Sequence, residues 1–165
     1  MQINVLDLQD SLAVNQSKIK KTVLQTLKAE KIIRTGQITI CLVTDKTIRA
    51  MNLKHLHKNE PTDVLAFALQ SPNPKNADIL ADIAVSTERA LDNAKALGSC
   101  PLYEIHLYVV HGTLHILGYD DNNQRAKRIM LEKASNILAA LNMEPTRPKG
   151  RGSLGRILKR PQASA

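Results

Sequence analysis

The chain has 165 residues, a formal net charge of +8 and 43% hydrophobic residues, which suits one compact domain with its own core. Aromatic side chains make up only 2% of the sequence, too few for a base-stacking module of the RRM type. Two cysteines exclude a disulfide framework, and no stretch approaches the roughly 20 apolar residues of a membrane span. The N-terminus lacks a basic region followed by an apolar stretch, so we expect no signal peptide and a cytoplasmic protein.

The predicted elements mix strands and helices along the chain. In chain order, the patterns predict a strand over residues 2–8, a helix over 16–33, a strand over 37–43, a helix over 45–56, strands over 64–69 and 79–85, and helices over 86–98, 102–117 and 122–141. Asp45 and Ser86 are predicted N-caps, Gly98 a helix end, and Pro101 a first-turn residue. These elements predict an α+β fold, in which a small mixed β-sheet packs against about five helices and the apolar helix 102–117 is central.

Positive charge is concentrated at the C-terminal end of the sequence. Residues 145–165 carry six basic residues and no acidic one, which leaves 17 of the 23 basic residues to face 15 acidic ones elsewhere. We therefore expect a single domain over residues 1–144 and a basic, disordered tail over residues 145–165. Such a tail is either a solvated segment or an element that strengthens binding to a polyanion through counterion release.

Residues 111–121, HGTLHILGYDD, are the most informative stretch. Positions four residues apart differ by about 40° around an α-helix, so His111 and His115 face the same way. Gly118 can adopt the left-handed conformation that ends a helix and reverses the chain. A residue just beyond it can then return to the same point. Three nitrogen or oxygen ligands with one open position are typical of a catalytic zinc site, so we expect a metal site at the end of the central helix and metal-dependent hydrolysis.

Histidines on an apolar helix also occur as hydrogen-bonded core residues. Burying two imidazoles without polar partners would cost roughly a few kcal/mol, and a metal would give both of them a partner, so the pair favours metal binding. Zinc proteases with the same histidine spacing have a glutamate directly after the first histidine as general base. Gly112 occupies that position here, which argues against a protease of that kind.

The stretch HGTLHILGYDD resembles the H-G-x-L-H-L-x-G-Y-D-H pattern of the YbeY endoribonucleases, bacterial rRNA maturation factors. Residues 52–67 are similar to that family's N-x-x-Y-R-x-x-x-x-P-T-D-V-L-S-F segment, and residues 80–83 resemble its L-G-D-I strand. The resemblance covers roughly residues 38–141. It implies a single-strand-specific, metal-dependent endoribonuclease that holds one zinc ion per chain through three histidines. It further implies a role in rRNA maturation and ribosome quality control, with RNA and the ribosome as partners.

The third ligand of the family pattern is a histidine, and the matching residue here is Asp121. A carboxylate is an acceptable zinc ligand, so the expected ligand set is His111, His115 and Asp121, a harder site that also suits manganese. The sequence of residues 121–124 also has capping-box spacing, so the Asp121 carboxylate could instead cap the last helix. Asp120 is then expected to orient the loop or a ligand imidazole.

Leu56 stands where the family has an arginine that faces the metal across the cleft, where a guanidinium can hold the scissile phosphate. Leucine cannot hold a phosphate. The catalytic residues are therefore unassigned, and His55, His57 and Lys58 are possible helpers, unless they simply face solvent.

Three further positions complete the comparison with the family pattern. Ala81 replaces the glycine of the L-G-D-I strand, and Asp63 or Asp82 is expected to hold a water or to contact a ligand. Two functions follow from all of these residues. One is an active endoribonuclease, which the retained histidine pair favours. The other is a catalytically impaired RNA- or ribosome-binding factor of the same fold.

Overall fold

The computed structural model describes residues 1–69 and 78–145. The strands are β1 (Gln2–Asp7), β2 (Gly36–Val43), β3 (Val64–Leu69) and β4 (Ile79–Ser86). The helices are α1 (Gln16–Ala29), α2 (Asp45–Leu56), α3 (Thr87–Leu97), α4 (Pro101–Ile116) and α5 (Gln124–Ala140). The loop predicted between β3 and β4 and the basic tail beyond residue 145 lie outside the described residues.

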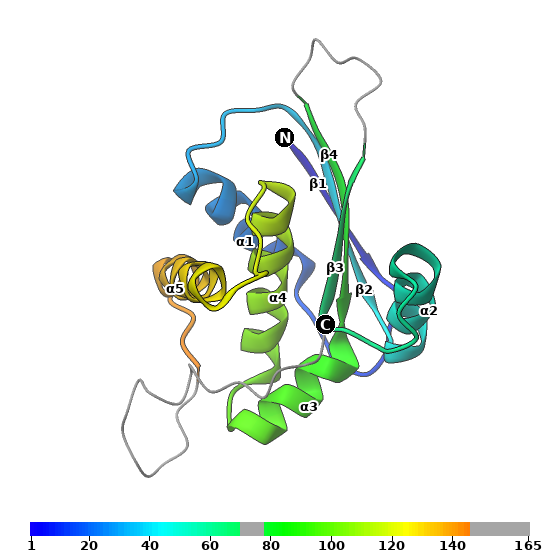
Figure 1. Ribbon diagram of the computed structural model, residues 1–165. Coiled ribbons are helices and arrows are strands. Elements are labelled where there is room, and N and C mark those ends of the chain that lie inside the picture. Colours follow the sequence, from blue (N-terminus) through cyan, green and yellow to red (C-terminus); the bar gives the residue numbers. More distant parts are fainter. Residues whose placement is uncertain (70–77, 146–165) are drawn as a thin grey trace.

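The four strands form one mixed sheet in the order β1-β2-β4-β3. β1 pairs with β2 and β2 with β4 in parallel, whereas β3 pairs with β4 in the antiparallel sense. Helices α1, α4 and α5 lie on one side of the sheet and α2 lies on the other, while α3 continues from the end of β4 (Figure 1). This arrangement confirms the predicted α+β class with a small mixed sheet and five helices.

Strand alternation divides the buried residues between the two sides of the sheet. Ala81, Ile83 and Val85 of β4 belong to the main core with α4, whereas Ala84 belongs to a smaller cluster with Ile48 of α2. α4 packs against α1, α3, α5, β3 and β4, and its residues 104–110 are all buried. The prediction that this helix is central is therefore confirmed.

Two predicted helix boundaries are wrong. α1 ends at Ala29, four residues before the predicted end, because Lys31 takes a left-handed conformation (φ 55°) and the Ile32 amide bonds back to the Leu27 carbonyl at 2.9 Å. This turn keeps Ile32 against the core, which explains why the apolar spacing continues past the helix. α2 is capped by Thr44, whose hydroxyl accepts a 3.3 Å bond from the Thr47 amide, and not by Asp45.

Candidate metal centre

The end of α4 is built as the sequence predicts. Gly118 has a φ of +94°; its amide bonds to the His115 carbonyl at 3.0 Å, and the next amide, that of Tyr119, bonds to the Leu114 carbonyl at 3.1 Å. This pair of bonds is the Schellman motif, which ends a helix and turns the chain back. Tyr119 therefore lies beside the last turn of α4 and carries the chain towards α5.

The His115 imidazole is oriented by that turn. Its Nδ1 atom lies 3.0 Å from the backbone oxygen of Tyr119, and because a carbonyl only accepts hydrogen bonds, Nδ1 carries the proton. In the neutral ring the lone pair then resides on Nε2. Metal-binding histidines in proteins commonly donate the other ring N–H to a carbonyl in this way, so His115 has the arrangement of a metal ligand.

His111 lies one turn earlier on α4. Its Nε2 atom is buried, and the residue interacts with its surroundings. The nitrogen of a neutral imidazole is a ligand that zinc accepts. The two histidines therefore fit two ligand positions of a zinc site.

Asp121 does not join the histidines in this structure. In the described part of the chain, no three His, Cys, Asp or Glu side chains lie together so that they could hold a metal ion. The alternative prediction, that Asp121 caps the last helix, is wrong. The N-cap of α5 is Asn123, whose side chain accepts a 2.9 Å bond from the Ala126 amide. Asp121 is exposed, and Asp120 accepts a 3.2 Å bond from the Asn122 amide within the loop.

Gly112 is required by packing. A Cβ atom on this residue would lie 2.5 Å from Cγ2 of Ile83 and 3.0 Å from Cγ2 of Val64. α4 thus approaches β3 and β4 closely at the residue that follows His111. The position that holds the general base in zinc proteases points into the core here, which gives a second reason to exclude that mechanism.

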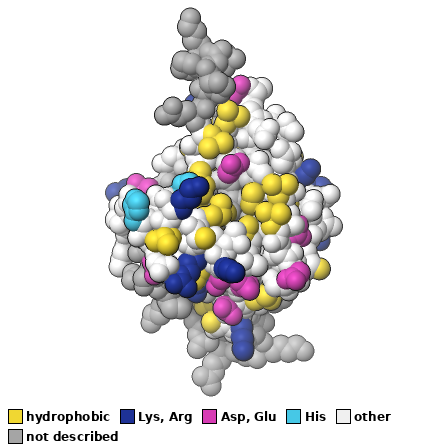
Figure 2. Space-filling model, turned by 90° about the vertical axis from the view of Figure 1, so that its right-hand side faces the viewer, with side chains coloured by type: hydrophobic (Ala, Val, Ile, Leu, Met, Phe, Trp, Pro, Cys, Tyr) yellow, Lys and Arg dark blue, Asp and Glu magenta, His cyan; other side chains and the backbone are white. Residues whose placement is uncertain are grey.

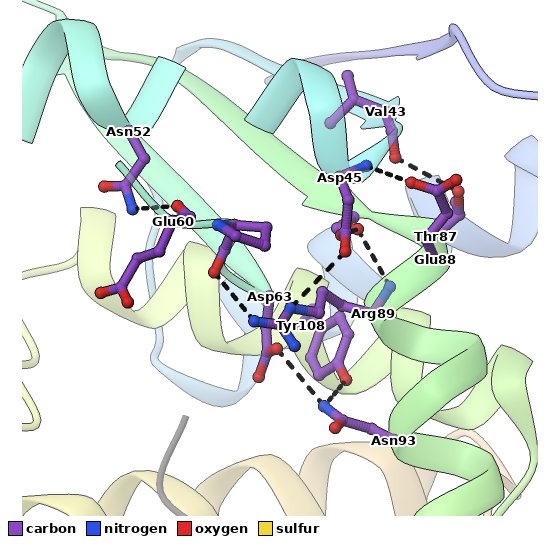
Figure 3. Close-up of polar contacts among 12 residues, drawn as sticks. Val43, Asp45, Asn52, Glu60, Asp63, Thr87, Glu88, Arg89, Asn93 and Tyr108 are labelled. Atoms are coloured by element: carbon purple, nitrogen blue, oxygen red, sulfur yellow. Dashed lines mark hydrogen bonds and ion pairs between the residues drawn. The ribbon is translucent and has the colours of Figure 1, made fainter. Parts of the chain in front are cut away.

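The segment before β3 is fixed by side chains from α2 and α3 (Figure 3). Asn52 donates to the Glu60 carbonyl at 2.8 Å, and Arg89 donates to the Pro61 carbonyl at 3.1 Å. Asn93 donates to Asp63 at 3.4 Å and to the Tyr108 hydroxyl at 2.6 Å. Asn93 of α3 therefore links Asp63 to Tyr108, which lies about one turn before His111 on α4.

Asp82 lies on the other side of the sheet. Its neighbours Ala81 and Ile83 face α4, so the Asp82 carboxylate points towards the side that carries α2. There it raises the pKa of Cys41, after the larger effect of burial on that thiol. Asp82 therefore lies on the side of the sheet opposite α4. Ala81, which replaces the family's glycine, is buried in the main core.

The possible helper residues gather at the end of α2, on the side of the molecule shown in Figure 2. Leu56 is 51% exposed. The His55 ring packs on Phe67 of β3, with 4.8 Å between ring centres. His57 ends α2 in a left-handed conformation, with a φ of 58°, and its side chain and that of Lys58 are exposed. His55 therefore contacts the sheet, and His57 is the residue at which α2 ends.

Glu30 and Lys133 lie near the site, although no local sequence pattern predicts this. The Tyr119 hydroxyl donates a 2.6 Å bond to Oε2 of Glu30 at the end of α1, and Lys133 of α5 donates a 2.8 Å bond to Oε1 of the same carboxylate. The Lys133 ammonium also lies 5.1 Å from the centre of the Tyr119 ring. We call Glu30, Tyr119 and Lys133 the Tyr119 cluster. It joins α1 and α5 to the turn that follows the histidine pair.

Comparison with known proteins identifies the family. The family model described as Endoribonuclease YbeY matches residues 4–142. The chain belongs to the YbeY family. A curated relative from Carboxydothermus hydrogenoformans, named Endoribonuclease YbeY, is 36% identical over 143 residues, which cover 85% of this chain and 97% of the relative. A relative of the same name from Geobacillus kaustophilus is 31% identical and covers 86% of this chain and 96% of the relative.

A solved structure shows the same fold. The solution structure of a Thermotoga maritima protein aligns with a TM-score of 0.54 and 21% identity, covering 86% of this chain and 92% of that protein. The YbeY match begins within β1 and extends past the end of α5. Among the described residues, no helix is long and apolar enough to cross a membrane.

Proposed function

We propose that this chain is a metal-dependent endoribonuclease that cleaves single-stranded RNA in rRNA maturation and ribosome quality control. The family membership supports an RNA-cleaving role. The observation that carries the proposal is the His115 Nδ1 bond to the Tyr119 carbonyl, because it leaves Nε2 as a lone-pair donor on the helix that also presents His111.

We propose that His111, His115 and Asp121 hold one zinc ion, and that manganese can replace it. Asp121 reaches the histidines in this proposal by a change in the exposed turn 120–123 that precedes α5. Bound zinc supplies a Lewis acid that activates water for attack on a phosphodiester. The chain's own residues orient the site: the Tyr119 carbonyl fixes His115, and Asn93 of α3 bonds to Asp63.

Two observations favour a second candidate, an RNA- or ribosome-binding factor without catalysis. Asp121 does not lie with the histidines among the described residues, and Leu56 provides no positive charge at the position of the family's arginine. A missing phosphate donor costs about 3 kcal/mol of transition-state stabilisation, by analogy with oxyanion-hole donors. This loss corresponds to a rate lower by about a hundredfold, so slow cleavage remains measurable.

The first test is the metal content of the purified protein together with cleavage of single-stranded RNA. We expect about one zinc or manganese ion per chain, and we expect His115→Ala to lose both the metal and the cleavage while it still binds RNA. His55→Ala, which removes an exposed imidazole from α2, is the matched control and should keep the metal. RNA binding without metal and without cleavage in the unmodified protein would establish the second candidate instead.

The role of Asp121 is tested by two substitutions. Asp121→Ala should weaken zinc binding, whereas Asp120→Ala, which alters the neighbouring carboxylate, should change it less. Asp121→His introduces the imidazole of the family pattern and should tighten zinc binding, because imidazole is a softer ligand than carboxylate. Equal zinc affinity in Asp121→Ala and the unmodified protein, measured by competition with a chelator, would remove Asp121 from the ligand set.

A further inference from the structure

The Tyr119 cluster holds one residue of the motif from two sides. Glu30 follows the last residue of α1, and Lys133 lies in the middle of α5. Each contacts the Tyr119 side chain directly, and they contact each other through a 2.8 Å ion pair. The Tyr119 side chain is therefore fixed both at its hydroxyl and at the face of its ring.

The ion pair in this cluster is less exposed than an ordinary surface pair. The Glu30 side chain is only 11% exposed, and that of Lys133 is 35% exposed, so salt screens the pair less than a solvated one. Burial alone would raise the pKa of Glu30, but the hydrogen bonds from Lys133 and Tyr119 and the Lys133 charge outweigh burial and lower it. The hydrogen bond to Glu30 is the main reason that the pKa of Lys133 is raised. Both groups therefore stay charged near neutral pH.

The backbone of the same tyrosine is tied to α4. Its amide bonds to the Leu114 carbonyl, and its carbonyl accepts the proton of His115 Nδ1. A shift of the Tyr119 side chain therefore moves the peptide that orients the imidazole. Glu30 is therefore connected to His115 through its hydrogen bond with the Tyr119 hydroxyl and through the hydrogen bond between the Tyr119 carbonyl and the imidazole.

We propose that Glu30 and Lys133 are positioning residues for His115: they hold Tyr119 so that its carbonyl keeps the imidazole in the Nδ1–H tautomer, with Nε2 available to a metal. The orientation of His115 can be observed without metal. The consequence for metal affinity rests on the proposed function. If Glu30 and Lys133 only linked α1 to α5, their replacement would change the stability of the protein alone. Measurements of the His115 tautomer and of zinc affinity therefore distinguish a positioning role from a structural one.

The test uses Lys133→Met and Tyr119→Phe, which remove the cation and the hydroxyl with little change in shape. The imidazole tautomer is read from long-range proton–nitrogen NMR spectra of the metal-free protein at about pH 8, where imidazoles are neutral, with the His115 signals assigned by their loss in His115→Ala. We expect Nδ1–H in the unmodified protein and a mixture of tautomers in both variants. Zinc affinity should fall about tenfold, the lower end for residues that support a ligand.

Matched variants control for charge and for folding. Lys133→Arg keeps a cation beside Glu30 and over the ring, and it should restore both tautomer and affinity. Lys127→Met and Glu132→Gln change exposed residues of the same helix and should alter neither. A lower melting temperature in Lys133→Met with unchanged tautomer and affinity would overturn the proposal. If the unmodified protein shows Nδ1–H, the variants lose it and no form binds zinc, the positioning role stands and the proposed metal function fails.

Discussion

A buried histidine that belongs to no proposed ligand set has a pKa well below its ordinary value. His106 of α4 is 4% exposed, and its Nδ1 lies 2.7 Å from the hydroxyl oxygen of Thr22. That hydroxyl donates its single proton to the Lys18 carbonyl at 3.1 Å, so Nδ1 of His106 is the donor in their contact. Burial, and to a smaller extent the charge of Lys18, lower the pKa of His106 from 6.5 to about 4.

This residue predicts a loss of stability in mild acid. The unfolded chain takes up a proton at His106 below about pH 6.5, whereas the folded protein does so only near pH 4. The contribution of His106 is therefore complete above pH 6.5 and falls as the pH drops towards 4, by on the order of 3 kcal/mol. Urea unfolding at several pH values between these limits measures the change.

The control for this prediction is a comparison of two histidines. His106→Gln should flatten the dependence of the unfolding free energy on pH between 6.5 and 4, whereas His55→Gln, at an exposed position, should preserve it. The Glu30 carboxylate, whose pKa is lowered below 4.5, contributes at lower pH, since its stabilisation is lost only as the pH falls through that range. An unchanged slope in His106→Gln would show that other groups cause the acid sensitivity.

At the scale of elements, α2 ends under backbone strain. The residue after its last turn, His57, has a φ of 58°, and a non-glycine residue in this region costs about 1 kcal/mol. Glycine adopts the conformation without that cost and is the usual residue at such helix ends. His57, which has this strained conformation, directly follows Leu56, the position of the family's arginine.

Replacement at this helix end therefore has a predictable sign. His57→Gly should raise the free energy of unfolding by up to about 1 kcal/mol, because it relieves the left-handed conformation. Lys54→Gly, inside the same helix, should lower it by about 1 kcal/mol because glycine is a poor helix former. Thermal unfolding of the two variants checks both values, and destabilisation by His57→Gly would show that the imidazole makes a contact worth more than the strain.

Most element boundaries are predictable because their signals are local. Ser86 caps α3, Gly98 ends it with a φ of 66°, and a proline begins α4, all as predicted. The cap of α2 is not predictable in this way, because Thr44 and Asp45 are adjacent and both suit an N-cap. Asp45 instead accepts a 2.5 Å bond from Ser86 and lies 3.9 Å from Arg89, contacts that the sheet topology creates.

At the scale of the whole molecule, the candidate site also combines features that have a local sequence signal with features that depend on contacts between distant residues. The helix that carries both histidines is predictable, and their four-residue spacing places them on one face of it. Asp63 and Asp82 are equivalent candidates in the sequence, and only the tertiary structure separates them, because Asp63 bonds to Asn93 of α3 whereas Asp82 lies near Cys41 of β2. The Glu30 contacts to Tyr119 and Lys133 span 89 and 103 residues, so no local pattern predicts them.

The basic tail over residues 145–165 gives a prediction that involves the whole chain. Because six of its residues are basic, its removal should reduce the salt dependence of RNA binding. The slope of log affinity against log salt should decrease by up to about 4, given about 0.7 per phosphate contact on single strands. Titrations of single-stranded RNA at several salt concentrations measure this slope. An unchanged slope in the truncated protein would identify the tail as a solvated segment.

The placement of both histidines on α4 has a consequence for metal exchange. A metal that joins residues from distant parts of a chain restricts the unfolded state and often becomes necessary for folding. His111 and His115 belong to one helix, and Asp121 is only six residues further along, so an ion bound there closes a very short loop. Removal of the metal by a chelator should therefore leave the far-UV circular dichroism spectrum unchanged. Under the proposed function, a bound ion should therefore exchange for another without unfolding of the chain.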